Sequence, residues 1–284
     1  MTQLSDELAA KRDRLLDLVA SFGSCAVAYS GGVDSAVVAK AAQLTLGDAA
    51  IAVTGVSASL AEGELEQAIA LANVIGIRHK QLDTDELANR AYAANAPDRC
   101  FHCKTELYTQ LAGLSERLGV AVIASGTNAD DLSDYRPGLA AAAEHDVRAP
   151  LADCGITKAD VRALAAAWNL PVAEKPASPC LSSRVAYGQA VTPERLRMID
   201  RAEQIVRSLG IQVCRVRYLA GDVARIEVPS ESIATLRDPA NHAMLTDEVR
   251  RLGFRSVTID PRGFRSGSLN ESLPVCQIDM PTLG

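Results

Sequence analysis

Short apolar segments alternate with helix-like segments through the first half of the chain. The predicted strands are 25–30, 49–55, 78–83 and 120–125, and the predicted helices are 33–46, 60–75, 85–94 and 104–118. Strands that are separated by helices form a parallel sheet covered on both faces, because right-handed crossovers place helices there. The pattern therefore predicts a doubly wound α/β domain.

The pattern changes beyond Pro176. A predicted helix at 193–209 precedes an alternating segment, 213–228, whose Gly221-Asp222 turn is typical of a β-hairpin. Further helical stretches and a last strand predict a small α+β domain. We expect residues 1–175 to form the larger domain and residues 176–284 the smaller one.

Composition narrows the class of protein. Hydrophobic residues make up 48% of the chain and charged residues 23%, and no apolar run approaches the ~20 residues of a membrane span. The seven cysteines are odd in number and widely spread, which favours free thiols or metal ligands over a disulfide framework. The acidic start of the chain does not look like an export signal. We therefore expect a cytoplasmic protein without membrane contact.

The segment SGGVDS (30–35) follows an apolar strand and opens a helix. In that position backbone N–H groups and the positive end of the helix bind an anion. Gly31 and Gly32 allow the backbone to approach phosphates closely. The loop lacks the GxxxxGK pattern of a Walker A motif, which disfavours kinase-type or GTPase-type chemistry. The alternative is a simple turn with a helix cap.

Other loops end at the same edge of the predicted sheet. Ligands of doubly wound sheets bind beyond the carboxyl ends of the strands, where the loops at Ser30, Thr54 and Ser125 fall. One nucleotide pocket could use all three loops. Asp130 and Asp131 lie just beyond and could contribute to the site or form a solvated turn.

Three cysteines stand out by their positions. Cys100 and Cys103 form a CxxC pair, and Cys180 lies in SPCLSSR near the predicted domain junction. A CxxC pair can be a redox pair, half of a zinc site, part of an iron–sulfur site or incidental packing. Three thiolates leave one position of a 4Fe-4S cluster without a protein ligand, and iron at that position could carry sulfide. His102, inside the pair, stays unassigned.

These motifs together resemble a known family. SGGVDS is similar to the PP-loop of ATP pyrophosphatases, which have an adenine nucleotide hydrolase-like fold. With DRCFHCK, ASGTNADDLSDYRPG, KPASPCLSSRVAYG and CRVRY, the chain resembles LarE-type sulfurtransferases of nickel-pincer nucleotide biosynthesis from about residue 4 to 260. The resemblance implies that ATP adenylates a carboxylate of pyridinium-3,5-biscarboxylic acid mononucleotide, and that sulfur then replaces AMP to give a thiocarboxylate.

The resemblance also implies roles for particular residues. For pyrophosphate and ATP it implies Ser30, Gly31, Gly32, Asp34, Ser35, Thr54, Gly126 and Arg136, with Asp34 near Mg²⁺. Cys180 matches the family's catalytic cysteine, which in some members gives up its own sulfur. In other members three cysteines hold a 4Fe-4S cluster that relays sulfide, and Cys100, Cys103 and Cys180 match that set. We expect the cluster type here because the CxxC pair is present.

The second domain supplies candidates for substrate binding. Arg215 and Arg217 lie two apart on a predicted strand, so both project from one face and could hold a phosphate, although such a face is often solvent-exposed. Ser182, Ser183 and Arg184 adjoin Cys180 and could orient the same substrate. Glu227 is a weaker candidate for a metal ligand.

Other functions stay open at this point. A PP-loop tRNA thiolase also uses cysteines, but the net charge of −6 argues against nucleic acid as a partner. Amide-forming relatives such as NAD synthetase and GMP synthetase use ammonia and need no cysteine trio. A non-catalytic nucleotide-binding module is a further alternative. The expected partners are a mononucleotide substrate, sulfide and further copies of the chain in a homo-oligomer.

Overall fold

The computed structural model describes residues 4–133, 137–176 and 178–265. Contacts divide the chain into two compact units. The first runs to Ser182 and includes Ala190–Pro193, and the second comprises Ser183–Gln189 and the chain from Glu194. The division predicted after residue 175 stays a prediction. Within the described residues, no helix combines the length and apolar character that a membrane span requires.

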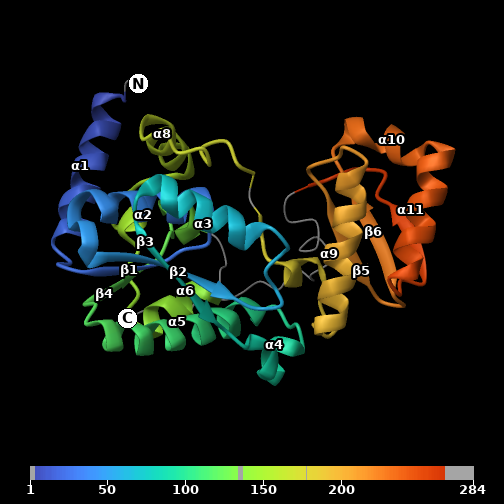
Figure 1. The fold of residues 1–284 in the computed structure, drawn as a ribbon, viewed down its shortest axis with the longest axis horizontal. Helices are drawn as coiled ribbons and strands as arrows, with labels where there is room; N and C mark the ends of the chain where they lie inside the picture. The colour runs from blue at the N-terminus through green and yellow to red at the C-terminus, as the bar shows by residue number, and fades with distance from the viewer. Residues whose placement is uncertain (1–3, 134–136, 177, 266–284) are drawn as a thin grey trace. The chain divides into compact units, whose positions relative to one another are not determined.

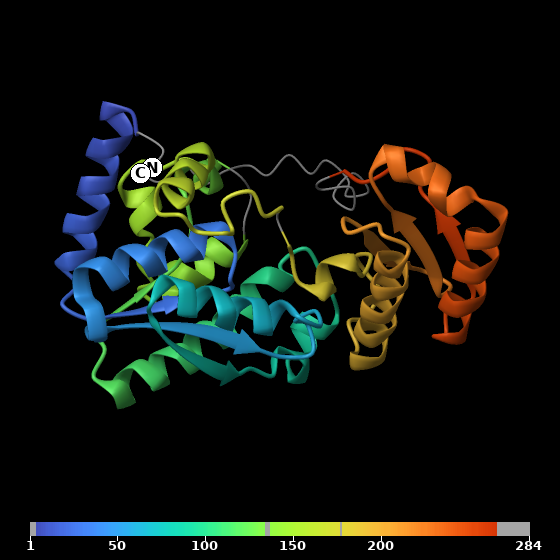
Figure 2. The same cartoon turned by 45° about the horizontal axis from the view of Figure 1, so that its top comes forward.

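The first unit has a parallel sheet of four strands in the order β3-β2-β1-β4, as Figures 1 and 2 show. Its strands are β1 (Cys25–Ala28), β2 (Ala50–Val56), β3 (Arg78–Asp83) and β4 (Val122–Ala124). Its helices are α1 (Asp6–Ala20), α2 (Val33–Leu46), α3 (Glu64–Ile75), α4 (Arg90–Ala93), α5 (Arg99–Leu118), α6 (Pro137–Glu144), α7 (Pro150–Asp153) and α8 (Lys158–Ala167). The predicted doubly wound α/β class is confirmed.

Helices cover both faces of this sheet. On one face α2 packs on β1 and β2 and contacts α1, α3 and α8, and α5 contacts β1 and β4 on the other face (Figure 1). The interior of α2 is rich in alanine and valine, with residues such as Ala36, Val37 and Ala39 fully buried. Because it is enclosed on several sides, α2 needs small apolar residues around its circumference rather than a single apolar stripe. The first turn of α2 is fixed at the sheet edge by this packing.

Two predicted elements of the first unit differ in the structure. The helix predicted at 104–118 begins at Arg99, so the CxxC pair lies in its first turns. The helix predicted at 85–94 is a 3₁₀ turn, Glu86–Ala88, followed by the short α4. The break occurs at Asn89, whose side chain accepts a hydrogen bond from the backbone N–H of Ala91 and caps α4.

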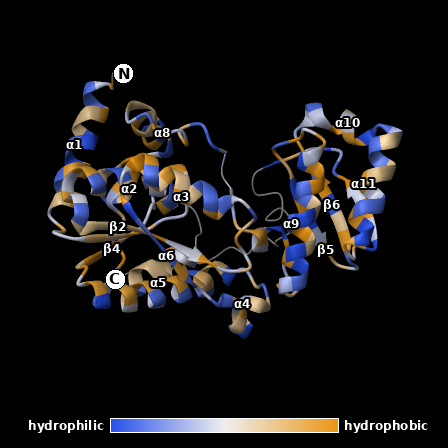
Figure 3. Cartoon of the chain, in the orientation of Figure 1, coloured by the Kyte–Doolittle hydropathy of each residue, from blue (hydrophilic) through white to orange (hydrophobic). Residues whose placement is uncertain are grey.

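The second unit is a three-stranded sheet with helices, in the strand order β5-β6-β7. Its elements are α9 (Pro193–Ser208), β5 (Arg215–Leu219), β6 (Val223–Glu227), α10 (Ile233–Arg237), α11 (Pro239–Arg251) and β7 (Ser256–Ile259). The predicted hairpin is confirmed as the antiparallel pair β5 and β6, and β7 runs parallel to β6. Figure 3 shows hydrophobic and hydrophilic residues interspersed along α9, whose Leu196, Ile199, Ala202 and Val206 are buried.

Candidate active site

The SGGVDS segment forms a closed loop at the N-terminus of α2. The backbone N–H of Ser30 donates to Ser35 Oγ (3.2 Å), and the backbone N–H of Gly32 donates to Ser30 Oγ (3.3 Å). Ser35 Oγ in turn donates to the carbonyl of Gly32 (3.1 Å). These hydroxyls hold the loop at the positive end of a 14-residue helix, where backbone N–H groups can bind phosphate.

Two glycines are required by close backbone approach. Gly31 has a φ of +71°, and a Cβ there would lie 3.0 Å from the Cβ of Ala68 on α3. A Cβ on Gly126 would lie 2.7 Å from the backbone nitrogen of Ser35, closer than Cβ atoms come in proteins. The loop after β4 therefore packs directly on the first turn of α2, which joins Gly126 to the phosphate loop.

The carboxylate of Asp34 lies among polar groups from two other segments. Asn128 Nδ2 donates to Asp34 Oδ1 (3.1 Å), and the ammonium of Lys158 is paired with Asp34 Oδ2. Carboxylate oxygens are hard ligands that suit Mg²⁺, so the side chain of Asp34 fits the ion implied by the family. Lys158 was not predicted from the sequence. The signal that could have placed it is the capping box of Thr157 and Asp160, which makes Lys158 the first residue of α8.

Asp130 and Asp131 help to build the turn that presents Asn128. The carboxylate of Asp130 accepts a hydrogen bond from the backbone N–H of Lys158 (2.8 Å), and the carboxylate of Asp131 accepts one from the backbone N–H of Asn128 (3.1 Å). Asn128 is 3% exposed, so its side chain is fixed. These contacts give both aspartates a structural part in the turn beside the phosphate loop.

The side chain of Thr54 is hydrogen-bonded to neighbouring segments of the sheet. Its buried hydroxyl donates to the carbonyl of Tyr29 (2.8 Å) and hydrogen-bonds with Nε2 of His79 (2.8 Å). A contact between Thr54 and ATP stays a prediction. Arg136, the other residue predicted to bind ATP, lies outside the described residues.

The cysteine residues of interest belong to the first unit. Cys100 and Cys180 are exposed and Cys103 is half-buried. Burial, then the nearby Cys180, raises the pKa of the Cys103 thiol to about 12. Cys180 lies near the CxxC pair although the two are distant in sequence, because Arg99, next to Cys100, donates a hydrogen bond to the carbonyl of Ser182. By contrast, Cys25, Cys154 and Cys214 are buried among core residues, and Cys276 lies outside the described residues.

Buried hydrogen bonds fasten the segment after Cys180 to the rest of the first unit. Ser182, 0% exposed, bonds through its hydroxyl to the hydroxyl of Tyr92 (2.6 Å), and its carbonyl accepts a hydrogen bond from Arg99 Nη1 (2.7 Å). The backbone N–H of Leu181 donates to the carbonyl of Ser59 (2.9 Å). Ser182, predicted to bind substrate, is thus also an anchor for Cys180.

Ser59, which bonds the backbone of Leu181, also contacts a buried carboxylate. Glu86 is 2% exposed, and its Oε1 accepts hydrogen bonds from the hydroxyls of Ser57 and Ser59, both at 2.6 Å. Its Oε2 accepts one from Thr84 Oγ1 (3.1 Å). Neither Glu86 nor Arg99 was predicted from the sequence, since their importance comes from burial that only the folded chain reveals.

The family-implied cluster can be tested against the donors present. Within the described residues, no three histidine, cysteine or acidic side chains are arranged as a metal site. The charges nevertheless fit an anionic group at the cysteines: Arg99, 6% exposed, directly precedes Cys100, and Lys104 directly follows Cys103 in α5. Three thiolates on iron form such an anionic group. His102 pairs with Asp98 (3.3 Å).

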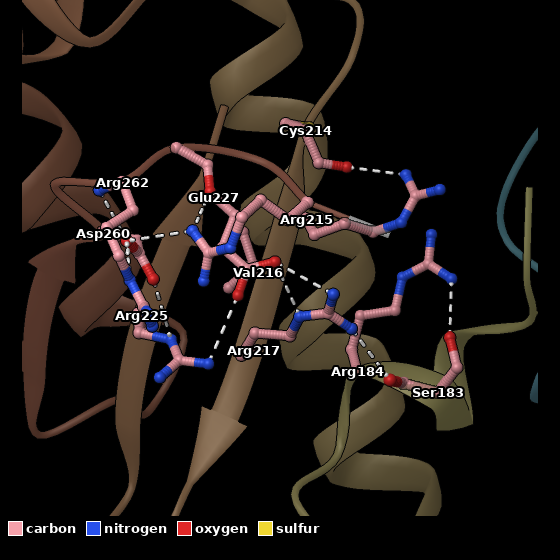
Figure 4. Close-up of polar contacts among 12 residues, drawn as sticks. Ser183, Arg184, Cys214, Arg215, Val216, Arg217, Arg225, Glu227, Asp260 and Arg262 are labelled. Carbon is pink, nitrogen blue, oxygen red and sulfur yellow. Dashed lines mark hydrogen bonds and ion pairs between the residues drawn. The ribbon is translucent and has the colours of Figure 1, made fainter. Parts of the chain in front are cut away.

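The second unit contains a buried cluster of arginines, shown in Figure 4. Arg184, Arg215 and Arg217 are 1%, 9% and 6% exposed, so the predicted arginines are interior rather than solvent-exposed. Arg215 Nη1 donates to the carbonyl of Cys214 (2.8 Å), and its guanidinium lies 5.2 Å from the ring centroid of Phe264. Burial, followed by the nearby Arg184, lowers the pKa of Arg215 to about 10. An anion bound here would offset this repulsion.

Two fully buried glutamates hold the cluster in place. Glu203 accepts hydrogen bonds from Arg184 Nε (3.0 Å) and Arg207 Nη2 (2.8 Å). Glu227 accepts hydrogen bonds from Arg217 Nε (2.9 Å) and Arg225 Nη2 (3.2 Å). The carboxylate that was the weaker candidate for a metal ligand is therefore bonded to two guanidinium groups.

Ser183 completes the predicted set in this unit. Its carbonyl accepts a hydrogen bond from Arg217 Nη1 (3.0 Å), and its hydroxyl accepts one from Arg184 Nη1 (3.1 Å), as the dashed lines of Figure 4 show. The structure thus brings Ser183, Arg184 and Arg217 into direct contact. Their predicted roles toward substrate stay predictions.

The chain is similar to a known family model and to known proteins. The family model described as NAD synthase matches residues 10–107. An uncharacterized protein of Synechocystis is 44% identical over 266 residues, which are 94% of this chain and 99% of that protein. The pyridinium-3,5-bisthiocarboxylic acid mononucleotide synthase of Lactiplantibacillus plantarum is 36% identical over 276 residues, 95% of this chain and 98% of that enzyme.

A second group of relatives matches less of the chain. A tRNA-specific 2-thiouridylase of Azorhizobium caulinodans is 35% identical over 212 residues, 60% of this chain and 53% of that enzyme. This likeness covers only part of each protein, whereas the synthase is matched over nearly its whole length.

Proposed function

Because this chain belongs to the LarE-type family of PP-loop ATP-dependent sulfurtransferases, we propose that it converts the carboxylates of pyridinium-3,5-biscarboxylic acid mononucleotide to thiocarboxylates in nickel-pincer nucleotide biosynthesis. One observation carries the proposal. The segment bearing Cys180 is fastened by Tyr92 and Arg99 beside the CxxC pair, within the unit that contains the phosphate loop. Activation and sulfur chemistry thus share one unit.

The first step is activation of a carboxylate by ATP. The backbone N–H groups of the loop at residues 30–35 hold the departing pyrophosphate, and Asp34, which Asn128 holds by a hydrogen bond, offers carboxylate oxygens to Mg²⁺. The substrate carboxylate attacks the α-phosphorus, the bond to pyrophosphate breaks, and an acyl adenylate forms. AMP is then a good leaving group for attack by sulfur.

The second step is transfer of sulfur. In the version that we favour, Cys100, Cys103 and Cys180 hold a 4Fe-4S cluster, which would supply a sulfide at the iron that no cysteine binds. In the alternative, Cys180 attacks the adenylate itself and surrenders its sulfur. The cationic surroundings of the cysteines favour the cluster version.

We propose that the second unit binds the phosphate of the mononucleotide. Arg184, Arg215 and Arg217 are buried and close enough for Arg184 to influence the pKa of Arg215, and planar guanidinium groups bind phosphate through paired hydrogen bonds. Ser183, in the same unit, would orient the same substrate. A cytoplasmic location and a homo-oligomeric assembly stay predictions.

Anaerobic incubation with the pyridinium mononucleotide, MgATP and sulfide tests the proposal. We expect AMP and pyrophosphate only when substrate is present, and a thiocarboxylate product by mass spectrometry. The Cys180→Ser variant should lose the product, whereas Cys154→Ser, at a cysteine packed in the hydrophobic core, should retain it. Replacement of sulfide by ammonia or of the mononucleotide by tRNA should give no turnover. Protein without iron whose Cys180 becomes dehydroalanine would reject the cluster version.

A further inference from the structure

Arg99 is a buried cation that donates hydrogen bonds to two neutral oxygen atoms. It is 6% exposed, and its Nη1 donates to Asn95 Oδ1 (2.6 Å) and to the carbonyl of Ser182 (2.7 Å). Within the described residues, no carboxylate forms an ion pair with it. Asn95 is itself fully buried, so the amide cannot be exchanged for water without opening the core. Among the residues that the structure describes, the positive charge of Arg99 therefore has no carboxylate to balance it.

A buried guanidinium without a counter-charge is costly, since low-dielectric surroundings disfavour an isolated ion. The nearby carboxylate of Glu86 is bonded to the hydroxyls of Ser57, Ser59 and Thr84 instead. Burial raises the pKa of Tyr92, so its hydroxyl stays neutral. Within the described part of the chain, the negative charge that could offset Arg99 is that of the sulfur site, either from the cysteines or from an anion bound among them.

The position of Arg99 is specific to that site. It immediately precedes Cys100 in α5, and its contact with Ser182 places it two residues from Cys180 along the other segment. Sulfide at neutral pH carries a negative charge as hydrosulfide and needs a cationic group to hold it away from water. Guanidinium groups suit this task because they stay protonated and present several donors.

We propose that Arg99 binds the anionic sulfur donor, hydrosulfide, at the cysteine site; this inference rests on the proposed sulfur transfer. In the step that it serves, the sulfur of HS⁻ attacks the acyl carbon of the adenylate and forms a C–S bond. The C–O bond to AMP breaks, AMP leaves as an anion, and the thioacid loses its proton to water. No oxidant or reductant is needed.

The Asn95→Asp variant tests the charge of Arg99 without removing the side chain. Asn95 has a φ of +57°, a conformation that aspartate also tolerates, and the new carboxylate would keep the 2.6 Å contact while neutralising Arg99. We expect the sulfide concentration for half-maximal rate to rise about tenfold, with kcat and pyrophosphate formation nearly unchanged. Asn89→Asp, the same change at the exposed cap of α4, should leave the sulfide dependence unaltered.

Arginine variants supply the second measurement. Arg99→Gln should raise the sulfide requirement further, and Arg99→Lys should restore part of the affinity, with circular dichroism confirming folded protein in each case. A purely structural role predicts a lower Tm and lower kcat at an unchanged sulfide requirement, and that result would overturn the inference. Wild-type protein that forms thiocarboxylate without added sulfide would also overturn it, while leaving the proposed function intact. Failure of wild type to form any thiocarboxylate would refute the proposed function itself.

Discussion

The ammonium of Lys158 is paired with the carboxylate of Asp34, the residue of the phosphate loop implied to lie near Mg²⁺. The two residues are 124 positions apart and meet because α8 begins beside the first turn of α2. A divalent cation at Asp34 must compete with this ammonium. We expect the ammonium, once displaced from Asp34, to bind a phosphate oxygen as the cation that the loop sequence lacks.

Lys158→Met is therefore expected to change metal and nucleotide binding in opposite directions. Without ATP, Mn²⁺ should bind up to about fivefold more tightly, since a partly exposed ion pair contributes at most about 1 kcal/mol. Affinity for ATP should fall because a phosphate-binding cation is lost. Electron paramagnetic resonance titration with Mn²⁺ measures the first effect. Lys175→Met, which removes a similar pair with Glu64, is the control; equal Mn²⁺ affinity in all three proteins would contradict the competition.

Gly126→Ala should damage the phosphate loop directly. The new Cβ would lie 2.7 Å from the backbone nitrogen of Ser35 and 3.0 Å from the carbonyl carbon of Asp34, so the backbone must shift. We expect a loss of about 1–3 kcal/mol in the free energy of unfolding and a marked loss of ATP binding, measured by calorimetry.

Gly113→Ala is the matched control for this change. Gly113 lies inside α5, and a Cβ there has no neighbour within 4 Å. Alanine should stabilise the helix by about 0.5–1 kcal/mol and leave ATP binding intact. Similar ATP affinity in both glycine variants would show that the loop after β4 does not define the phosphate site.

The buried glutamates of the second unit should be essential for stability. Glu203→Gln leaves the guanidinium groups of Arg184 and Arg207 without their carboxylate, and breaking a buried pair on one side costs about 3–5 kcal/mol. Denaturant unfolding measures this loss. Glu194→Gln, at a pair with Arg197 that is 68% exposed on both sides, should change stability by less than about 0.5 kcal/mol. Equal effects would mean that the cluster is not a stabilising feature.

Much of the first unit could be predicted because its pattern is local. The bounds of α2 (Val33–Leu46) and β3 (Arg78–Asp83) follow from an apolar run after a glycine loop and from a short segment between turns. The phosphate loop was visible for the same reason. Its predicted role depends on the SGGVDS motif and on the strand and helix that flank it, which are all adjacent in the sequence.

What the sequence did not reveal depends on contacts between distant segments. Arg99 reads as an ordinary charged residue before a CxxC pair, and only its contact with Ser182, 83 positions away, shows that it is buried. The early start of α5 follows from the same burial. Lys158 likewise gained meaning only when folding placed it on Asp34. Charged residues are ambiguous in sequence because their usual place is the surface.

The pair of Lys11 on α1 and Asp160 on α8 gives the first unit a predictable dependence on pH. Lys11 Nζ lies 2.7 Å from Asp160 Oδ2. Burial by itself raises the pKa of Asp160, but hydrogen bonds from Lys11 and Thr157 outweigh it and lower the pKa below its ordinary 3.8. The hydrogen bond from Asp160 raises the pKa of Lys11 above 10.5. The pair is therefore charged across the neutral range.

The contribution of Asp160 to stability depends on pH in a definite direction. Because the folded pKa of Asp160 is depressed, its contribution to stability is present above pH 3.8 and is lost as the pH falls through the folded value. Asp160→Asn should lower the free energy of unfolding by about 1 kcal/mol at pH 7, through loss of the ion pair and of half of the capping box. Urea unfolding from pH 7 to pH 3 should show the variant and wild type converging in acid. A difference that stays constant over this range would assign the effect to helix capping alone, and Glu7→Gln, at the exposed partner of Lys11, should show neither effect.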